Sequence, residues 1–453
     1  MQSFSIPLAT LQDADTIAAP ATPPGASAIA LIRISGPKSH SIITALSGGR
    51  PLPGPRVAAV RRLSHGGQAL DEALVTPFCA PHSYTGEEMV EIGCHGNPLI
   101  VRRVLDAVFD LGGRLAHPGE FTQRAFLNGR MDLTQAEAVM DLIAARTDLA
   151  LRSAHAAREG RLGRAISALR DTLVDVLAHV EAHIDFPDED IEPATARSLK
   201  DRLAAQGAEI DRLLATAEAG RILREGIRTV ITGAPNAGKS SLLNALIGSD
   251  RAIVTPLPGT TRDTVEEWIS VEGIPLHLID TAGIRHATEP AEIEGIRRSR
   301  IALESAELIL RVIDAAAKPD PIEEAIGRDC DPARTIVVFN KCDLPPAREP
   351  SGLRVSAVTG EGIGALRRAI TERVWAGPPA GESLVTVNAR HRDCLRRAAA
   401  PLRRASDGLG HGMPLECVAI ELREALGALT DIIGITTAED ILDRLFGSFC
   451  IGK

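Results

Sequence analysis

Aromatic residues are scarce in this chain of 453 residues: they make up 3%, with one tyrosine and two tryptophans. The core must therefore be built mainly from leucine, isoleucine, valine and alanine. The scarcity also argues against a broad aromatic platform for stacking nucleic-acid bases. Hydrophobic residues amount to 44% and charged residues to 24%, a globular composition that argues against collagen-like, coiled-coil and fully disordered chains.

An excess of positive charge is also lacking. Lysine and arginine number 50 against 59 acidic residues, for a formal net charge of −9. This balance argues against a protein that coats nucleic acid through bulk charge, although a local basic patch or a basic partner stays open. No apolar run reaches the roughly 18 residues of a membrane span, and residues 1–15 lack a signal-peptide pattern. We therefore expect a cytoplasmic protein without a membrane segment.

The seven cysteines form no CxxC pair, and their spacings fit no zinc ribbon or finger. An odd number without a secretory signal indicates reduced cytosolic thiols. They are Cys79, Cys94, Cys330, Cys342, Cys394, Cys417 and Cys450.

The length predicts roughly three domains at about 150 residues each. Residues 15–115 mix short apolar strands, expected at 28–34 and around 89–92, with a helix over 99–111, which indicates a small α+β domain. Two helical stretches are expected, over about 132–183 and 194–224, separated by Pro187 and an acidic turn, and the pair Thr134 and Glu137 predicts a capping box at the start of the first.

From residue 228 onward, strands alternate with helices, which predicts a parallel α/β sheet. The expected strands are 229–232, 274–280, 308–314 and 335–340. The chain becomes helical again after residue 377, and this last segment could pack on the earlier helices. The predicted fold is a multidomain α/β plus α protein in which an α/β domain is inserted into a discontinuous helical bundle. The predicted domains are 1–130, 131–225, 226–377 and 378–453.

Gly233 to Ser240 fits the phosphate-loop pattern G-x-x-x-x-G-K-[ST] in full. The motif follows a predicted strand and opens a helix expected over 241–247, a context that disfavours a chance match in an ordinary turn. Its backbone N–H groups would close around phosphate oxygens. Lys239 would contact the β- and γ-phosphates, and the Ser240 hydroxyl would bind Mg²⁺.

Three further segments follow in the order expected of a GTPase. Asp280 to Gly283 can hold the Mg²⁺ shell and meet the γ-phosphate. Asp343, in Asn340 to Asp343, can accept two hydrogen bonds from guanine, whereas adenine offers no such donor pair. A second base loop is expected at Ser356 and Ala357, and residues 259–263 can act as a switch. The predicted nucleotide-binding residues are Asn236, Ala237, Gly238, Lys239, Ser240, Ser241, Thr255, Thr260, Thr261, Asp280, Thr281, Ala282, Gly283, Asn340, Lys341, Asp343, Ser356 and Ala357.

The water-orienting glutamine that many small GTPases carry after this Asp-x-x-Gly segment is missing. Ile284 stands there and cannot polarise water. Hydrolysis then needs another group to orient water and another source of positive charge. Glu292 is a candidate for the first role, although from the residues alone an ordinary solvated helix carboxylate is the better interpretation.

The whole chain from about residue 15 resembles the tRNA wobble-uridine modification GTPases, the MnmE/TrmE family. The segments that carry the resemblance, beside the GTPase motifs, are 15–17, 21–25, 33–36, 83–87, 95–96, 118–121, 124–128, 132–137 and 449–453. It implies an N-terminal domain that binds a tetrahydrofolate derivative, a discontinuous helical domain, and an inserted Ras-like P-loop GTPase domain. It also implies a homodimer formed through the N-terminal domains.

The resemblance implies a partner as well: a flavin-containing protein of the MnmG (GidA) type, which carries FAD and joins this chain in a heterotetramer. Together such proteins install an aminomethyl or carboxymethylaminomethyl group on C5 of the wobble uridine of certain tRNAs. The one-carbon unit comes from 5-formyl-tetrahydrofolate or a related folate. Neither the tRNAs nor the amine donor, glycine or ammonium, follows from the sequence.

Carried over by position, the resemblance makes Asn236 a K⁺ ligand, with the site completed at Thr255, Leu257 and Thr260. K⁺ there would place positive charge near the phosphates, as an arginine finger does elsewhere. Thr261 matches a Mg²⁺ ligand, and Glu292 matches the family's water-orienting glutamate.

For folate, the matching positions are Arg33, Glu91, Arg130 and Lys453. Taken one at a time, each would be better interpreted as a surface salt bridge. Two positions depart from the family: Arg130 replaces a lysine, and residues 26–30 replace a glycine-rich run.

Cys450 lies between glycines near the end of the sequence, and three roles stay open for it. As a thiolate it could add to C6 of uridine and make C5 nucleophilic. It could instead bind the partner or cofactor, or be a spare thiol. Two other functions of the whole chain are weighed: a ribosome-assembly switch without RNA chemistry, and a scaffold for the flavin partner. The switch leaves the N-terminal motifs and the terminal CIGK unexplained.

Overall fold

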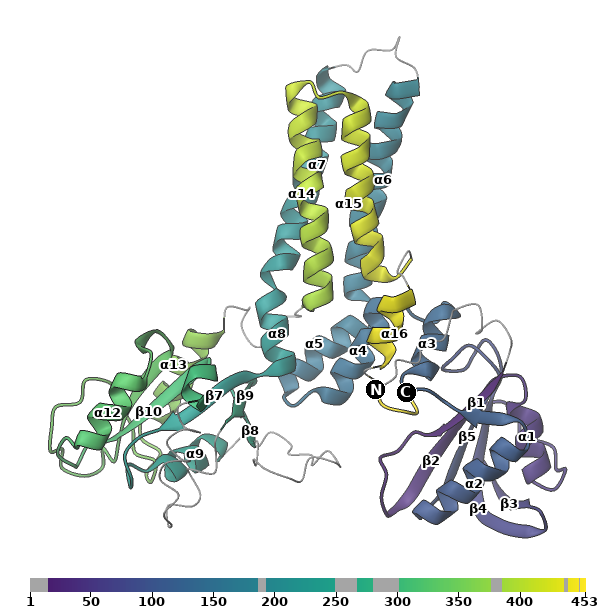
Figure 1. Cartoon of the computed structure of the whole chain (residues 1–453), viewed down its shortest axis with the longest axis horizontal. Helices are drawn as coiled ribbons and strands as arrows, with labels where there is room; N and C mark the ends of the chain where they lie inside the picture. Colours follow the sequence, from purple (N-terminus) through teal and green to yellow (C-terminus); the bar gives the residue numbers. More distant parts are fainter. Residues whose placement is uncertain are drawn as a thin grey trace. The chain divides into compact units, whose positions relative to one another are not determined.

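The computed structural model describes residues 15–185, 193–248, 267–279, 301–375, 385–435, 439–447 and 449–453 (Figure 1). The chain divides into two compact units. The first comprises residues 1–140, 166–170 and 426–453, and the second comprises 141–165 and 171–425. Within the described ranges, every helix is too short or too polar to span a lipid bilayer.

The first unit is built on a six-stranded sheet in the order β3-β4-β5-β2-β1-β6. The strands are β1 (Thr16–Pro20), β2 (Ser27–Ser35), β3 (Ala59–His65), β4 (Gln68–Phe78), β5 (Met89–Gly96) and β6 (Gly113–Leu115). Only β1 and β6 pair in parallel among these neighbours. The strand predicted at 28–34 is confirmed as β2, because alternating apolar residues give it one buried face.

Helices α1 (Ser39–Leu46) and α2 (Pro98–Asp110) pack on this sheet through a shared apolar core (Figure 1). The helix predicted at 99–111 is confirmed as α2, shifted by one residue. It begins where it does because Asn97 accepts a hydrogen bond from Leu99 N at 2.8 Å and Pro98 occupies the first helical position.

Helix α3 (Glu120–Leu127) packs on β1 through Phe121. Helices α4 (Leu133–Ala144) and α16 (Glu439–Gly447) pack beside α3. Leu133 of α4 and Phe446 of α16 share one apolar cluster. The predicted capping box at Thr134 and Glu137 is wrong. Asp132 caps α4 instead: Asp132 Oδ1 accepts from Gln135 N at 2.9 Å, and Gln135 Oε1 accepts from Asp132 N at 3.0 Å. Aspartate and glutamine make the same reciprocal pair as threonine and glutamate, two residues earlier.

The second unit contains a bundle of helices, some of which precede the inserted sheet in the sequence and others of which follow it (Figure 1). The helices are α5 (Asp148–Arg158), α6 (Arg161–Asp185), α7 (Pro193–Ala215), α8 (Ala217–Glu225), α14 (Ala389–His411) and α15 (Leu415–Ile433), of which residues 166–170 and 426–433 are assigned to the first unit. Ion pairs mark the neighbours: Arg403 of α14 lies 2.8 Å from Asp211 of α7, and Arg423 of α15 lies 2.6 Å from Glu181 of α6. Helices far apart in sequence thus form one bundle, which confirms the discontinuous helical fold.

The inserted sheet has the order β12-β11-β10-β7-β9-β8. Its strands are β7 (Ile227–Thr232), β8 (Glu267–Val271), β9 (Ile274–Leu278), β10 (Leu308–Asp314), β11 (Thr335–Asn340) and β12 (Leu353–Arg354), and its helices are α9 (Lys239–Ile247), α12 (Pro321–Asp329) and α13 (Ile363–Val374). All neighbours pair in parallel except the β8–β9 hairpin. The predicted parallel α/β fold is confirmed, and β10 and β11 match their predicted bounds.

Side chains of the β8–β9 hairpin attach this sheet to the helices within the second unit. Trp268 of β8 stacks on His277 of β9 with ring centroids 4.4 Å apart, and the Arg146 guanidinium lies 4.1 Å above the Trp268 ring. At the hairpin turn, a Cβ added to Gly273 would lie 3.2 Å from Cβ of Leu149 in α5. The hairpin therefore packs on the segment that joins α4 and α5 and on the first turn of α5.

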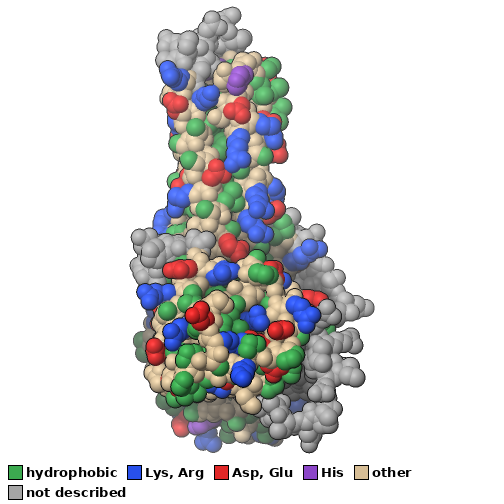
Figure 2. Space-filling view, turned by 90° about the vertical axis from the view of Figure 1, so that its left-hand side faces the viewer, with side chains coloured by type: hydrophobic (Ala, Val, Ile, Leu, Met, Phe, Trp, Pro, Cys, Tyr) green, Lys and Arg blue, Asp and Glu red, His purple; other side chains and the backbone are tan. Residues whose placement is uncertain are grey.

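Charge on the described surface is mixed. On the face shown in Figure 2, lysine and arginine side chains are interspersed with aspartate and glutamate rather than gathered into one basic patch. This distribution agrees with the acidic net charge and gives that face no strong positive field for nucleic acid.

Candidate functional site

The candidate nucleotide site lies where the parallel strands of the inserted sheet end. The phosphate loop follows β7, the segment Asn340 to Asp343 begins at the end of β11, and Ser356 and Ala357 follow β12. Because parallel strands bring their carboxyl ends to one edge of a sheet, the three segments converge there.

The phosphate loop approaches its neighbours too closely for side chains at two of its glycines. Gly233 has φ +154° and Gly238 has φ +91°. A Cβ at Gly233 would lie 2.2 Å from Val312 O, and one at Gly238 would lie 2.1 Å from Asn340 Nδ2. Asn236 adopts φ +61°, a left-handed conformation that asparagine tolerates better than most residues. The loop is thus a cradle that side chains would fill.

Lys239 is the first residue of α9 and sits half-buried inside this loop. Its Nζ donates hydrogen bonds to Gly233 O at 2.9 Å and to Ala234 O at 3.0 Å. Burial lowers the pKa of the lysine, and no described carboxylate pairs with it. A half-buried cation beside the positive end of a helix dipole favours an anionic ligand such as phosphate.

Asn340 joins all three segments. Its Nδ2 donates to Ala237 O at 3.0 Å, and its Oδ1 accepts from Ala357 N at 3.1 Å. The side chain is buried, so these bonds hold the phosphate loop and the second base loop at fixed positions. Asp343 is exposed three residues further on, and Ser356 is buried with its Oγ accepting from Thr359 N at 3.1 Å.

The sequence did not indicate that Lys341 has a partner in Asp314. Lys341 Nζ lies 2.6 Å from Asp314 Oδ2, and Lys341 has φ +65°. Asp314 ends β10 and is the register partner of Asn340 at the end of β11. The pair could have been predicted from the sequence, because Asp314 ends the predicted strand that precedes the strand ending at Asn340, and parallel strands end at the same edge of a sheet.

Several predicted site residues lie outside the described residues. Among the phosphate-loop positions, Asn236, Ala237, Gly238, Ser240 and Ser241 are described. Outside lie Thr255, Leu257, Thr260, Thr261, Asp280, Thr281, Ala282, Gly283, Ile284 and Glu292. The assignments of the K⁺ ligands, the second Mg²⁺ ligand and the water-orienting glutamate therefore stay predictions.

The second candidate site centres on Arg33 and Glu91 in the first unit. They are register partners on β2 and β5. Arg33 Nε and Nη2 donate to the same oxygen, Glu91 Oε1, at 3.1 and 2.8 Å. The Arg33 guanidinium also lies 4.9 Å from the centroid of the Tyr84 ring, which fixes its plane. Glu91 Oε2 accepts no hydrogen bond from the described residues.

The end of the chain folds back onto this pair. Arg33 Nη1 donates to Gly452 O at 3.5 Å, and a Cβ at Gly452 would lie 2.1 Å from Pro20 O. Burial, and next the charge of Arg33, lower the pKa of Lys453, while Cys450 and Glu91 act in the opposite direction. Four predicted residues, Arg33, Glu91, Cys450 and Lys453, are therefore brought together.

Arg130 stands apart from this cluster. It is exposed, and a Cβ at Gly86 would lie 3.2 Å from Arg130 Cγ. In the part of the chain that the structure describes, no hydrogen bond or ion pair links Arg130 to Arg33 or Glu91. Its place in a folate site stays a prediction.

The sequence also missed a buried ion network in the first unit. Glu120 Oε1 lies 2.9 Å from Arg124 Nη2 and 2.5 Å from Arg114 Nη2, and Asp15 bonds to both arginines. Burial alone would raise the pKa of Glu120, but hydrogen bonds from Arg114 and the His117 backbone N–H and the charge of Arg124 lower it. The signal was Glu120 and Arg124 four residues apart on a helix. This network stabilises the fold around the site.

Comparison with known proteins shows similarity over nearly the whole chain. The family model "MnmE helical domain" matches residues 133–450, and "GTP-binding protein TrmE N-terminus" matches residues 16–130. The tRNA modification GTPase MnmE of Akkermansia muciniphila is 49% identical over 446 residues, covering 97% of this chain and 99% of that protein. The protein of that name from Symbiobacterium thermophilum is 47% identical over 456 residues, covering 97% of this chain and 99% of that protein. The one from Chloroflexus aurantiacus is 46% identical over 456 residues, covering 97% of this chain and 100% of that protein.

Proposed function

The chain belongs to the MnmE family of tRNA modification GTPases and is a GTP hydrolase that acts in tRNA modification, and on that premise we propose its full reaction. With a flavin-containing partner of the MnmG type, it adds an aminomethyl or carboxymethylaminomethyl group to C5 of the wobble uridine of certain tRNAs. The one-carbon unit comes from 5-formyl-tetrahydrofolate or a related folate. FAD resides on the partner, the two proteins form a heterotetramer, and the reaction takes place in the cytoplasm.

The observation that carries the GTPase chemistry is the half-buried Lys239 ammonium, which has only backbone carbonyls as described partners. A triphosphate would supply the missing negative charge at the N-terminus of α9. Ser240 and Thr261 would hold Mg²⁺, which neutralises charge on the phosphates. Asp343 would accept hydrogen bonds from the guanine edge, and the Asn340 network would hold its loop in place.

We further propose that K⁺ stimulates hydrolysis. Asn236 lies in the tight phosphate loop and adopts the left-handed backbone conformation that the loop requires there. Its amide oxygen is a ligand type that suits an alkali cation. With Thr255, Leu257 and Thr260 it would hold K⁺ beside the phosphates, and Glu292 would orient water because Ile284 cannot.

For the one-carbon site, the supporting observation is that Glu91 Oε2 accepts no hydrogen bond from the described residues. Because Arg33 occupies only Oε1, Oε2 is available to accept hydrogen bonds from the amino-pyrimidine edge of a pterin. Lys453 and Arg130 are basic side chains suited to the carboxylates of a folate tail. The Cys450 thiol is exposed near this pair, where it would act on the uridine or bind the partner or cofactor.

We also propose a homodimer formed through the N-terminal domains. Ile29, Val60 and Leu74 are 66, 58 and 46% exposed. They form one apolar patch on the sheet: Val60 pairs with Leu74, and a Cβ at Gly93 between them would lie 3.7 Å from Leu74 Cβ and 3.9 Å from Ile29 Cγ2. Clustered exposed apolar residues on a sheet face favour burial against another protein surface.

The test is reconstituted modification of tRNA with purified flavin partner, folate and GTP. We expect the wild-type chain to form modified uridine, and Glu91→Gln to lose folate binding while retaining GTP hydrolysis. Cys450→Ser is expected to lose modification but to bind folate and partner if the thiol acts on uridine. Full modification by Glu91→Gln would reject the one-carbon site and favour a scaffold role for this chain.

A further inference from the structure

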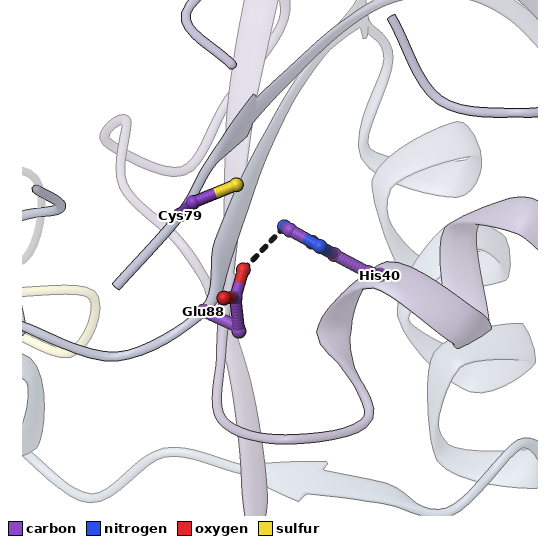
Figure 3. A group of neighbouring side chains, drawn as sticks. All are labelled: His40, Cys79 and Glu88. Atoms are coloured by element: carbon purple, nitrogen blue, oxygen red, sulfur yellow. Dashed lines mark ion pairs between the residues drawn. The ribbon is translucent and has the colours of Figure 1, made fainter. Parts of the chain in front are cut away.

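Three side chains with metal-binding atoms converge at a second place in the first unit. His40 lies in the first turn of α1, Cys79 directly follows β4, and Glu88 directly precedes β5. Their ligand atoms all lie within 4.8 Å of one another, and Figure 3 shows the three side chains directed toward a common point. None of the three belongs to the nucleotide site or to the Arg33 cluster.

His40 and Glu88 form an ion pair (Figure 3), at a distance that fits two ligands of one metal ion as well as a long hydrogen bond. His40 Nε2 and Glu88 Oε2 are 3.2 Å apart. Both atoms are shielded from solvent, yet neither makes a hydrogen bond within the described residues. In a tetrahedral zinc site, nitrogen and oxygen ligands with bonds of about 2.0–2.1 Å lie about 3.3 Å from each other. Together with the nearby Cys79 Sγ, this spacing is compatible with three ligands of one ion.

Backbone contacts hold the cluster in place from three elements. Glu88 O accepts from Gly36 N at 2.9 Å and from Ser39 Oγ at 3.0 Å, which ties the start of β5 to the start of α1. Glu88 Oε1 accepts from Ala80 N at 3.4 Å, next to Cys79. Such supporting contacts orient metal ligands before the ion binds.

The local charge also favours a cation. Burial, and next the negative charge of Glu88 and a hydrogen bond with its carboxylate, raise the pKa of the Cys79 thiol. This is the reverse of the environment that activates a nucleophilic cysteine. Within the described residues, His40 is the ion-pair partner of Glu88, and no lysine or arginine pairs with it. A divalent cation would neutralise both the thiolate and the carboxylate.

We propose that His40, Cys79 and Glu88 bind one Zn²⁺, with solvent as the fourth ligand, and that the ion fastens α1 to the connection between β4 and β5. One sulfur, one imidazole nitrogen and one carboxylate form a donor set that suits zinc better than Mg²⁺ or Ca²⁺, which prefer oxygen ligands alone. The three ligands are separated by 39 and 9 positions in the sequence, which is no zinc-ribbon spacing. They come together only when the chain folds. The proposal is independent of the folate and K⁺ assignments.

The test uses the full-length metal-free protein and Co²⁺ as a spectroscopic probe, followed by displacement with Zn²⁺. Coordination by Cys79 gives a thiolate-to-cobalt absorption band at one equivalent, which Zn²⁺ removes. Cys79→Ser is expected to lose the band and weaken Zn²⁺ binding by about 100-fold or more. Cys417→Ser, which removes an exposed cysteine of α15, is the matched control and keeps both.

Zn²⁺ is also expected to raise the unfolding temperature of the wild type and of Cys417→Ser, but not of Cys79→Ser or His40→Ala. GTP turnover of folded variants should stay unchanged. If Cys79→Ser fails to fold, X-ray absorption of the zinc-loaded wild type decides, because one sulfur ligand at about 2.3 Å is required. An unchanged cobalt band in Cys79→Ser, or zinc without a sulfur neighbour, would overturn the proposal.

Discussion

Asp343 is a single exposed carboxylate on which the choice of base depends. As an acceptor it matches the N1–H and amino group of guanine. Asp343→Asn replaces one acceptor by a donor, so we expect GTP affinity to fall by about 100-fold and xanthosine triphosphate, which offers a carbonyl in place of the amine, to bind more tightly than GTP. Nucleotide titration measures both. Asp329→Asn, another exposed aspartate, is the control, and an Asp343→Asn protein that still prefers GTP would remove Asp343 from the site.

Glu120 shows how one buried charge sets the pH dependence of the fold, since its side chain is only 1% exposed. Its pKa in the folded chain is lowered from 4.5 by Arg114 and Arg124. The stabilisation is therefore fully present above the unfolded value and is lost as pH falls through the lowered folded value. Glu120→Gln should cost about 3 kcal/mol at neutral pH. Urea unfolding at several pH values checks this, and the variant should lose less stability than wild type between pH 5 and 3.

At the scale of elements, the start of α14 depends on one side chain. Asn388 Oδ1 accepts from His391 N at 2.8 Å, and His391 Nδ1 accepts from Asn388 N at 3.3 Å. Asn388→Ala should lower stability by about 1 kcal/mol, whereas Asn388→Asp retains an acceptor and should lose little. Thermal unfolding of both variants measures this, and an Asn388→Asp protein that loses as much stability as Asn388→Ala would contradict the assignment of the cap.

Elements were predictable where local sequence decides them. The runs Leu308–Asp314 and Thr335–Asn340 are mainly apolar strands that end in polar residues, interrupted in the first by Arg311, and the structure has them at those bounds. The capping box failed because several residue pairs near residue 132 can make the same hydrogen bonds. The contact of Arg146 with Trp268 of β8 has no local signal, since the two residues lie more than a hundred positions apart.

At the scale of the whole molecule, the sequence does not show which distant residues meet. Arg33 and Gly452 are separated by 419 positions and make a hydrogen bond. Only the family resemblance related the ends of the chain; spacing and periodicity could not. The phosphate loop was predictable because its chemistry needs adjacent residues, whereas the His40, Cys79 and Glu88 cluster was not, because its members come from three separate elements.

The proposed homodimer gives a prediction about the oligomeric state of the protein. Leu74→Asp places a charge in the middle of the exposed patch formed with Ile29 and Val60. If this patch is the dimer interface, burying that charge costs several kcal/mol, and we expect a monomer at micromolar concentration. Sedimentation analysis measures it. Val358→Asp alters an apolar residue that is 83% exposed in the second unit and should leave the dimer intact; a dimeric Leu74→Asp protein would place the interface elsewhere.

The most direct test of a metal-assisted GTPase is the rate of GTP turnover in K⁺ and in Na⁺ at equal ionic strength, without partners. Asn236→Gly is the companion variant, because glycine retains the φ of +61° but removes the amide ligand. The account predicts that wild type is faster in K⁺ by about tenfold or more, as a cation replaces an arginine finger, and that Asn236→Gly loses this difference. Equal wild-type rates in the two salts would contradict it.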